Sequence, residues 1–278
     1  MADMRKWIGM IVPTLNNSFF SSLASSVEKE MRVKGFETYV ADSANNVSNE
    51  IVSIRQLESL GANGIISVSG LAELPEDLVS EDTPIVWVDR RPESKREIPW
   101  VGNDDASAME LAVEHLIERG CRTILLLPGY VAQDKDNPRV EGYRRALEKN
   151  GIPFRAEYVL NRPGRKSSEE EAGELITKAV RDGIIMDGII TSSDRAAFGA
   201  GRALQRIGYF VPEDVRLVSF DNSPYAAFAS PSLTTLDRRP EELAKRASEV
   251  LCACMEKETD IRQTNIIDVS LIRRGSSR

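Results

Sequence analysis

Histidine, cysteine and long apolar runs are scarce in this sequence, and each scarcity excludes a class of function. His115 is the single histidine among 278 residues, so most metal sites and every Ser-His or Cys-His nucleophile would have to use it. It lies in a predicted helix, where a structural role is favoured. No apolar run approaches the roughly 18 residues that a membrane-spanning helix needs. We therefore expect no membrane association, no bound metal and no cofactor.

Cysteine usage and the start of the chain indicate a reducing compartment. Cys121, Cys252 and Cys254 are an odd set. Cys252 and Cys254 lie in an apolar helical pattern, which favours buried small hydrophobic side chains over metal ligands. The first residues lack the long apolar segment and the small-residue cleavage site of a signal peptide. We therefore expect a cytoplasmic protein.

The charge balance argues against direct binding of nucleic acid. The formal net charge is −7, whereas phosphate binding requires clustered Lys and Arg to displace counterions. The short basic runs at 90–91, 238–239 and 273–274 are scattered, which is typical of a solvated surface. The Gly-Ala-Gly at 199–201 is not a dinucleotide-binding turn, because it lies inside a predicted helix rather than before one.

Short apolar runs alternate with amphipathic helices along the chain, which predicts an α/β fold. The runs at 64–68 and 84–88 read as short, continuous apolar stretches, as a parallel strand covered on both faces requires. The pattern runs through about 120 residues and then repeats, so two doubly wound halves are expected. The predicted strands are 8–12, 36–40, 64–68, 84–88, 123–127, 157–160, 188–191, 215–220 and 233–236, with a terminal run at 265–272.

The end of the first predicted strand carries the first candidate site residues. Pro13 ends the strand, and Ser18 is predicted to cap the following helix. Asn16, Phe19 and Phe20 therefore lie at the carboxyl end of a parallel strand, where open α/β sheets bind ligands. An amide beside two aromatic faces suits a sugar or a nucleobase. The alternative is a core role, since adjacent helical residues point about 100° apart and at least one phenylalanine should pack inward.

Charged residues follow other predicted strands. Asp89 and Arg90 come directly after the strand at 84–88, and Asp221 follows the strand at 215–220. The alternative for Asp89 and Arg90 is a surface ion pair, which stabilises a fold by only ~0–1 kcal/mol. With polar groups at the strand ends of both halves, a cleft between the halves is the expected ligand site.

Seven short motifs follow one another along the chain: Ile8-Gly9-Met10-Ile11-Val12-Pro13, Asn17-Ser18-Phe19-Phe20, Val88-Asp89-Arg90-Arg91-Pro92, Arg139-Val140-Glu141-Gly142-Tyr143-Arg144, Val211-Pro212-Glu213-Asp214-Val215, Phe220-Asp221-Asn222, and Pro231-Ser232-Leu233-Thr234-Thr235. In this order and spacing they resemble the LacI/GalR family of bacterial transcription regulators over nearly the whole chain. The resemblance implies a periplasmic-binding-protein-like type I fold, in which two doubly wound parallel-sheet subdomains are joined by three crossovers. It also implies a homodimer that closes on an effector.

The resemblance divides the chain and leaves one family part unassigned. The N-terminal subdomain is expected to span 1–120 and 237–260, and the C-terminal subdomain 121–236 and 261–278. The family's helix-turn-helix has no counterpart before Trp7. Two alternatives follow. The sequence is either the effector domain of a longer repressor, which would bind operator DNA only through the domain that this sequence lacks, or a stand-alone ligand binder.

The expected ligand site is similar to that of the sugar-binding members, especially bacterial ribose-binding proteins. By this resemblance, the asparagine and the two phenylalanines hold a furanose, the Asp-Arg pair grips hydroxyls, and an arginine and an aspartate of the second subdomain complete the site. The residues that the resemblance assigns to the ligand are Asn16, Phe19, Phe20, Asp89, Arg90, Arg139 and Asp221.

Two departures from the family pattern leave the ligand open. Ser193 stands where a sugar binder often has Asn, and Arg238 stands where the family more often has Gln. An extra cation would tolerate an acidic or phosphorylated sugar, although Arg238 could equally point at solvent. Both residues are included in the predicted site, and the ligand could be a pentose, a hexose, a phosphorylated sugar or a nucleobase.

Three functions are compatible with the sequence. The first is the effector-sensing domain of a transcription regulator, in which a small sugar related to ribose shifts a closed/open equilibrium and so changes DNA binding. The second is a sugar receptor of a transport system, which shares the fold. The third is a glycosidase that uses two of the many carboxylates. No pair of carboxylates is singled out, so no catalytic residue is predicted and a non-enzyme is expected.

Overall fold

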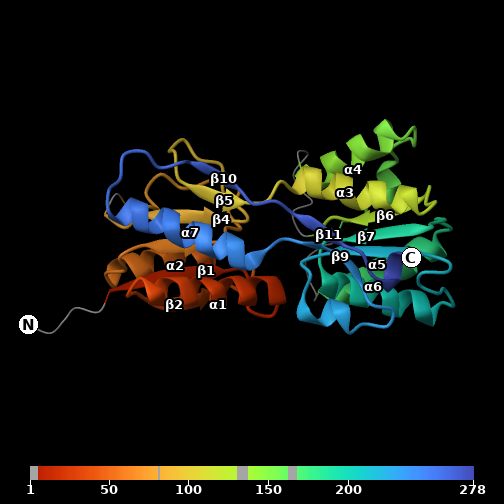
Figure 1. The fold of residues 1–278 in the computed structure, drawn as a ribbon, viewed down its shortest axis with the longest axis horizontal. Helices are drawn as coiled ribbons and strands as arrows, with labels where there is room; N and C mark the ends of the chain where they lie inside the picture. The colour runs from red at the N-terminus through yellow and green to blue at the C-terminus, as the bar shows by residue number, and fades with distance from the viewer. Residues whose placement is uncertain (1–5, 81, 130–136, 162–167) are drawn as a thin grey trace, which may run out of the picture. The chain divides into compact units, whose positions relative to one another are not determined.

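The computed structural model describes residues 6–80, 82–129, 137–161 and 168–278 and divides the chain into two compact units (Figure 1). Unit 1 consists of Met1–Asn103 and Arg239–Ile267, and unit 2 consists of Asp104–Arg238 and Asp268–Arg278. The chain therefore crosses between the units three times, as the family resemblance implies. Within the described ranges, no helix is both long and apolar enough to cross a membrane.

Unit 1 contains a six-stranded sheet in the order β10-β5-β4-β3-β1-β2. All of its strand pairs are parallel, so the carboxyl ends of the strands share one edge. The strands of this sheet are β1 (Trp7–Val12), β2 (Glu37–Asp42), β3 (Ile65–Ser67), β4 (Ile85–Val88), β5 (Trp100–Gly102) and β10 (Thr264–Ile266).

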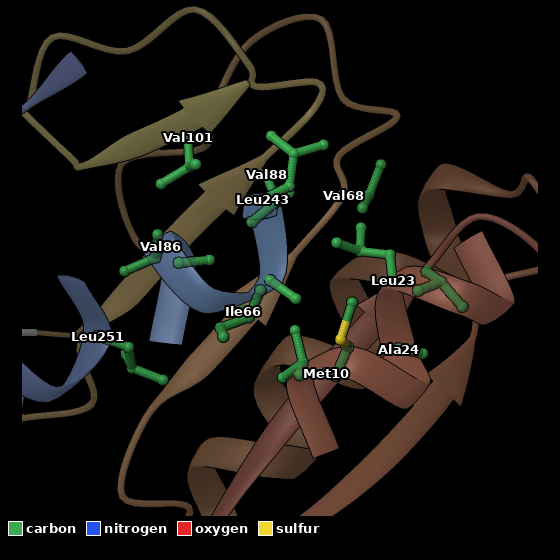
Figure 2. Packing of buried hydrophobic residues seen from close by; sticks show 14 of the residues in the cluster. Met10, Leu23, Ala24, Ile66, Val68, Val86, Val88, Val101, Leu243 and Leu251 are labelled. Carbon is green, nitrogen blue, oxygen red and sulfur yellow. The ribbon is translucent and has the colours of Figure 1, made fainter. Parts of the chain in front are cut away.

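Three helices cover the sheet of unit 1, and the alternation of side chains along β1 explains how. Ile8, Met10 and Val12 are buried in one cluster with side chains of α1 (Ser18–Val33) and α7 (Pro240–Met255), whereas Ile11 belongs to a second cluster with residues of α2 (Val47–Ser59). Figure 2 shows the first cluster from close by, with side chains of α1 and α7 directed at those of the strands. Burial on both faces is the reason for the continuously apolar strand sequences.

Unit 2 has the same layered plan. Its five-stranded sheet has the order β11-β9-β8-β7-β6, in which only β11 is antiparallel to its neighbour. One face packs against α3 and α4 and the other against α5 and α6 (Figure 1). The elements of this unit are α3 (Asp105–Glu118), β6 (Ile124–Leu127), α4 (Pro138–Lys149), α5 (Ser168–Arg181), β7 (Gly188–Thr191), α6 (Asp194–Arg206), β8 (Arg216–Phe220), β9 (Thr234–Asp237), β11 (Ser270–Ile272) and the 3-10 helices Ala156–Tyr158, Pro224–Ala227 and Gly275–Ser277.

Helices α3 and α4 approach each other closely. A Cβ atom on Gly142 would lie 2.1 Å from the carbonyl oxygen of Ala106, so the crossing point requires glycine. An ion pair joins the two helices near their other ends, where Lys149 Nζ lies 2.7 Å from Glu114 Oε1. The contact fixes α3 to unit 2 from its first turn onward.

This packing moves the boundaries between the units. The sequence predicts that the first subdomain extends to residue 120, but α3 belongs to unit 2 because it packs on α4 and on β6. The second crossing follows Arg238, close to the predicted position at 236. Residues 261–267 belong to unit 1 rather than to unit 2, because β10 pairs in parallel with β5.

Three local predictions differ from the structure. Asn17, not Ser18, is the N-cap of α1, since the Asn17 side chain accepts a hydrogen bond from Phe19 N at 2.9 Å. The predicted strand at 157–160 is a 3-10 turn with a single parallel bridge between Leu126 and Val159. The terminal run at 265–272 is divided between two sheets, as β10 and β11.

His115 is buried in unit 2 and takes part in anchoring the C-terminus. Its Nε2 lies 2.7 Å from Ser277 Oγ, which in turn donates to Thr234 Oγ1 at 2.7 Å. Burial, together with Arg119 and Arg273 nearby, lowers the pKa of His115 to about 4. The histidine is therefore neutral at pH 7, in keeping with the structural role that the sequence favours.

The low pKa of His115 predicts a loss of stability in acid. The unfolded chain binds a proton near pH 6.5 and the folded chain only near pH 4, so stability is complete above pH 6.5 and falls as the pH falls toward 4. From pH 7 to pH 5 we expect this residue to remove about 2 kcal/mol of unfolding free energy. Urea unfolding of the parent and of His115→Gln, which keeps a side-chain partner for Ser277, measures the difference. Parallel pH profiles for the two proteins would contradict the assignment.

Candidate functional site

The two phenylalanines at the start of α1 have different roles. Phe19 is 2% exposed and packs in the core cluster of unit 1, which confirms that one of the pair points inward. Phe20 is half-buried, and its ring centroid lies 5.3 Å from that of Phe19 in an edge-to-face arrangement. Phe19 therefore supports the ring of Phe20, which is the more accessible aromatic face.

The loop before α1 separates the two asparagines. Asn17 caps the helix, whereas Asn16 is exposed, and the backbone N–H of Asn16 donates to Thr14 Oγ1 at 3.1 Å. Leu15 N donates to Asp42 Oδ2 at 2.9 Å, which ties the loop to the end of β2. Asn16 is therefore held at the strand-end edge of the sheet, while its neighbour is committed to the helix.

Asp89 and Arg90 lie at the end of β4, next to Phe20. The Arg90 guanidinium lies 5.7 Å from the Phe20 ring centroid, and Arg90 Nε lies 3.9 Å from Asp89 Oδ2. Asp89 has a φ of 64°, a left-handed conformation that costs about 1–3 kcal/mol in a residue other than glycine. Its N–H donates to Val101 O at 2.9 Å. Asp89, Arg90 and the two phenylalanines therefore form one group in unit 1.

Glu50 is a buried carboxylate that the sequence analysis missed. It accepts hydrogen bonds from Ser69 Oγ at 2.6 Å and from Gly70 N at 2.7 Å, and burial raises its pKa. Ser69 N donates in turn to Arg90 O at 3.2 Å. Glu50 therefore connects α2 to the loops after β3 and β4. Glu50 lies four residues before the buried Ile54, so helical spacing places it on the buried face of α2, and this spacing could have identified it from the sequence.

Arg139 lies in the first turn of α4 and makes three contacts within unit 2. Its Nε donates to Asp105 Oδ2 at 2.9 Å, its Nη1 donates to Ser192 O at 3.2 Å, and its guanidinium lies 4.2 Å from the Phe220 ring centroid. The side chain is only 12% exposed. Arg139 is therefore fixed at the ends of β7 and β8 by Asp105, which was not predicted.

Asp221 and Arg238 form a buried pair after β8 and β9. The Arg238 Nη1 and Asp221 Oδ1 atoms are 3.8 Å apart, and the side chains are 5% and 4% exposed. Arg238 therefore does not point at solvent, which was one of the two orientations left open by the sequence. Asp221 has a φ of 105° and donates its N–H to Leu236 O at 2.9 Å.

Ser193 and Asp194 have structural partners at the start of α6. Ser193 is the N-cap and accepts from Ala196 N at 3.2 Å. The buried Asp194 carboxylate accepts from Thr235 Oγ1 at 2.8 Å, from Ser223 N at 2.6 Å and from the Ser219 hydroxyl. Asp194 therefore ties together the segments after β7 and β8 and the strand β9, and it was not among the predicted site residues.

The predicted site residues fall into two groups, one in each unit. Unit 1 brings together Phe19, Phe20, Asp89 and Arg90, with Asn16 on the loop before α1. In unit 2, Asp221 pairs with Arg238. Arg139 packs on Phe220, the residue before Asp221, and it donates to the carbonyl of Ser192, the residue before Ser193. In each group the chemistry is that of charged hydrogen-bonding groups beside an aromatic ring.

Comparison with known proteins places the sequence and the fold in one group. The periplasmic binding protein-like domain family matches residues 113–277. An uncharacterized HTH-type transcriptional regulator of Streptomyces limosus is 31% identical, covering 97% of this chain and 78% of the relative. The ribose operon repressor of Halalkalibacterium halodurans is 27% identical, covering 90% of this chain and 73% of the repressor. A solved periplasmic binding protein/LacI transcriptional regulator from Alkaliphilus metalliredigens, complexed with D-xylulofuranose, has 26% identity and a TM-score of 0.86, covering 98% of this chain and 99% of that chain.

The hydrogen bonds of Asp194 predict a large effect of its removal. Asp194→Ala leaves the N–H of Ser223 and the hydroxyls of Ser219 and Thr235 without their acceptor in a buried environment, which should cost about 3 kcal/mol of unfolding free energy. Asp182→Ala is the matched control, because its ion pair with Lys178 is solvent-exposed and contributes ~0–1 kcal/mol. Urea denaturation measures both variants. Equal losses would show that the Asp194 network does not stabilise unit 2.

Proposed function

Because the chain belongs to the LacI family of transcription regulators and has the family's periplasmic-binding-protein-like fold, we propose that it is an effector-sensing domain for a small sugar related to ribose. The effector would be bound by Asn16, Phe20, Asp89 and Arg90 from unit 1, together with a set from unit 2. That set is Arg139, Ser193, Asp221 and Arg238. DNA binding would be carried out by a helix-turn-helix domain of the regulator, which would act in the cytoplasm as a homodimer.

The observation that carries the proposal is the combination of aromatic faces and charged groups at the strand ends of both units. A sugar presents C–H surface that packs on a ring such as that of Phe20, and hydroxyls that donate and accept hydrogen bonds. Hydrogen bonds of hydroxyls to charged groups contribute about 1.5–3 kcal/mol each. Several such bonds, reduced by ordering costs, give an affinity in the micromolar range. The names of two relatives, which refer to ribose and to D-xylulofuranose, support a pentose.

Charge pairing favours a neutral sugar over a phosphorylated one. Arg90 lies 3.9 Å from Asp89, Arg139 lies 2.9 Å from Asp105, and Arg238 lies 3.8 Å from Asp221. A sugar phosphate carries about two negative charges, which would lie next to these carboxylates. Each guanidinium is already close to a carboxylate, so the pairs suit hydroxyls better than a phosphate.

Regulation requires that the effector distinguish two conformational states. A ligand that binds both states equally shifts no equilibrium, however tightly it binds. Assigning effector contacts to residues of both units gives the ligand a way to favour one state. A sugar receptor of a transport system would share this chemistry, but the relatives are named as regulators, which favours the regulator and gives no support to an enzyme.

The proposal predicts selective binding of a pentose. Isothermal titration calorimetry with D-ribose, D-xylulose, hexoses, ribose 5-phosphate and nucleobases should give saturable binding in the micromolar range for one or more pentoses, and weaker or no binding for the phosphate. Arg139→Ala and Asp221→Ala should each abolish the binding, because each removes a charged hydrogen-bonding group that is held in place in unit 2.

The control for these variants is Asp77→Ala, which breaks an exposed ion pair with Arg55 in unit 1 and should leave the affinity unchanged. Thermal unfolding in the absence of sugar checks that all variants are folded. Pentose binding by Arg139→Ala and Asp221→Ala at the affinity of the parent would refute the assigned site. Turnover of a disaccharide or sugar phosphate would instead indicate an enzyme.

A further inference from the structure

We propose that Trp100 is a positioning residue that holds Asp89 in its binding conformation. The proposal rests on the proposed function, in that Asp89 is assigned there to the sugar. The geometry that carries it is a clamp formed by Trp100, Val101 and Gly102 of β5 around the backbone of Asp89 at the end of β4.

Two consecutive residues of β5 bind both polar backbone groups of Asp89. Asp89 N donates to Val101 O at 2.9 Å, and the indole Nε1 of Trp100 donates to Asp89 O at 3.1 Å. The second bond is made by a side chain, because the left-handed φ of 64° at Asp89 ends the regular strand pairing there. Left-handed backbone persists in a residue other than glycine only when its surroundings favour it, and the indole supplies such a contact.

The surroundings of the indole fit this role. A Cβ atom on Gly102 would lie 2.1 Å from Cζ2 and 2.6 Å from Cε2 of Trp100, so only glycine leaves room for the ring in its present place. The guanidinium of Arg91 lies 4.8 Å from the Trp100 ring centroid. Trp100 N donates to Gln263 O at 2.8 Å, which anchors the backbone of the tryptophan itself. The position of the ring is thus restricted by Gly102 and Arg91, and that of its backbone by Gln263.

Trp87 provides an internal comparison. It lies on β4, two residues before Asp89, and is 1% exposed. Among the residues that the structure describes, its indole Nε1 has no hydrogen-bond partner. Of these two tryptophans of the same sheet, only Trp100 donates an indole hydrogen bond to the backbone of Asp89.

The first measurement requires no sugar. The three-bond coupling between the amide and α protons of Asp89 reports its φ, and amide hydrogen exchange reports the bond to Val101. Trp100→Phe removes the indole donor and keeps an aromatic ring, so we expect the Asp89 coupling to change and its amide to exchange faster. Trp87→Phe should change neither. Gly102→Ala displaces the indole without removing it, so it should reproduce the effect of Trp100→Phe. It replaces Trp100→Phe in the experiment if Trp100→Phe does not fold.

The second measurement uses D-ribose and D-xylulose as probes in calorimetry on the whole chain. Trp100→Phe should weaken pentose binding by about fivefold to tenfold, the effect of one lost hydrogen bond, and Trp87→Phe by less than about twofold. In the Asp89→Ala background, Trp100→Phe should cause no further loss, because the indole acts through that carboxylate.

The outcomes separate the two proposals. An unchanged coupling and exchange rate at Asp89 in Trp100→Phe, or equal affinity losses for Trp100→Phe and Trp87→Phe, would overturn the positioning role and leave the sugar site standing. If the parent binds no pentose but the Asp89 coupling responds to Trp100→Phe alone, the clamp stands and the proposed effector is wrong.

Discussion

Burial of the central strands on both faces is the constraint on which the rest of this structure depends. In β4 every residue is buried, and the first polar side chain that follows it is that of Asp89. In strands buried in this way, charged side chains lie at the strand ends and in the first turns of the following helices. This constraint explains why the candidate site residues gather at the carboxyl edge of each sheet rather than along its faces.

In both sheets a buried strand is followed directly by an aspartate with a positive φ. Asp89 follows β4 and Asp221 follows β8, both with positive φ, at 64° and 105°. Each donates its N–H to a carbonyl of the neighbouring strand at 2.9 Å, to Val101 in one unit and to Leu236 in the other. An aspartate in this conformation turns the chain away from the sheet and presents a carboxylate at the turn. The repeated α/β plan thus extends to the backbone geometry of the candidate site.

The sequence predicts the strands and the strand-end residues well, because both depend on local patterns. Continuous apolar runs located nearly all the strands, and the position of Asp221 follows directly from the end of β8. What depends on tertiary contacts was missed. The close approach of Gly142 to Ala106, which assigns α3 to unit 2, joins residues far apart in sequence. The partnership of Asp105 with Arg139 depends on the same helix contact.

The distances within the charge pairs also bear on how a sugar could bind. The nitrogen and oxygen atoms are 3.9 Å apart in Arg90 and Asp89 and 3.8 Å apart in Arg238 and Asp221, which is longer than a direct hydrogen bond of about 2.7–3.2 Å. A hydroxyl is both donor and acceptor, so it can donate to the carboxylate and accept from the guanidinium at the same time. The Arg139 and Asp105 pair, at 2.9 Å, is already a direct bond and fixes the arginine instead. Under the proposed function, the two longer pairs suit bridging by hydroxyls and the shorter pair preorganises the site, which lowers the cost of ordering on binding.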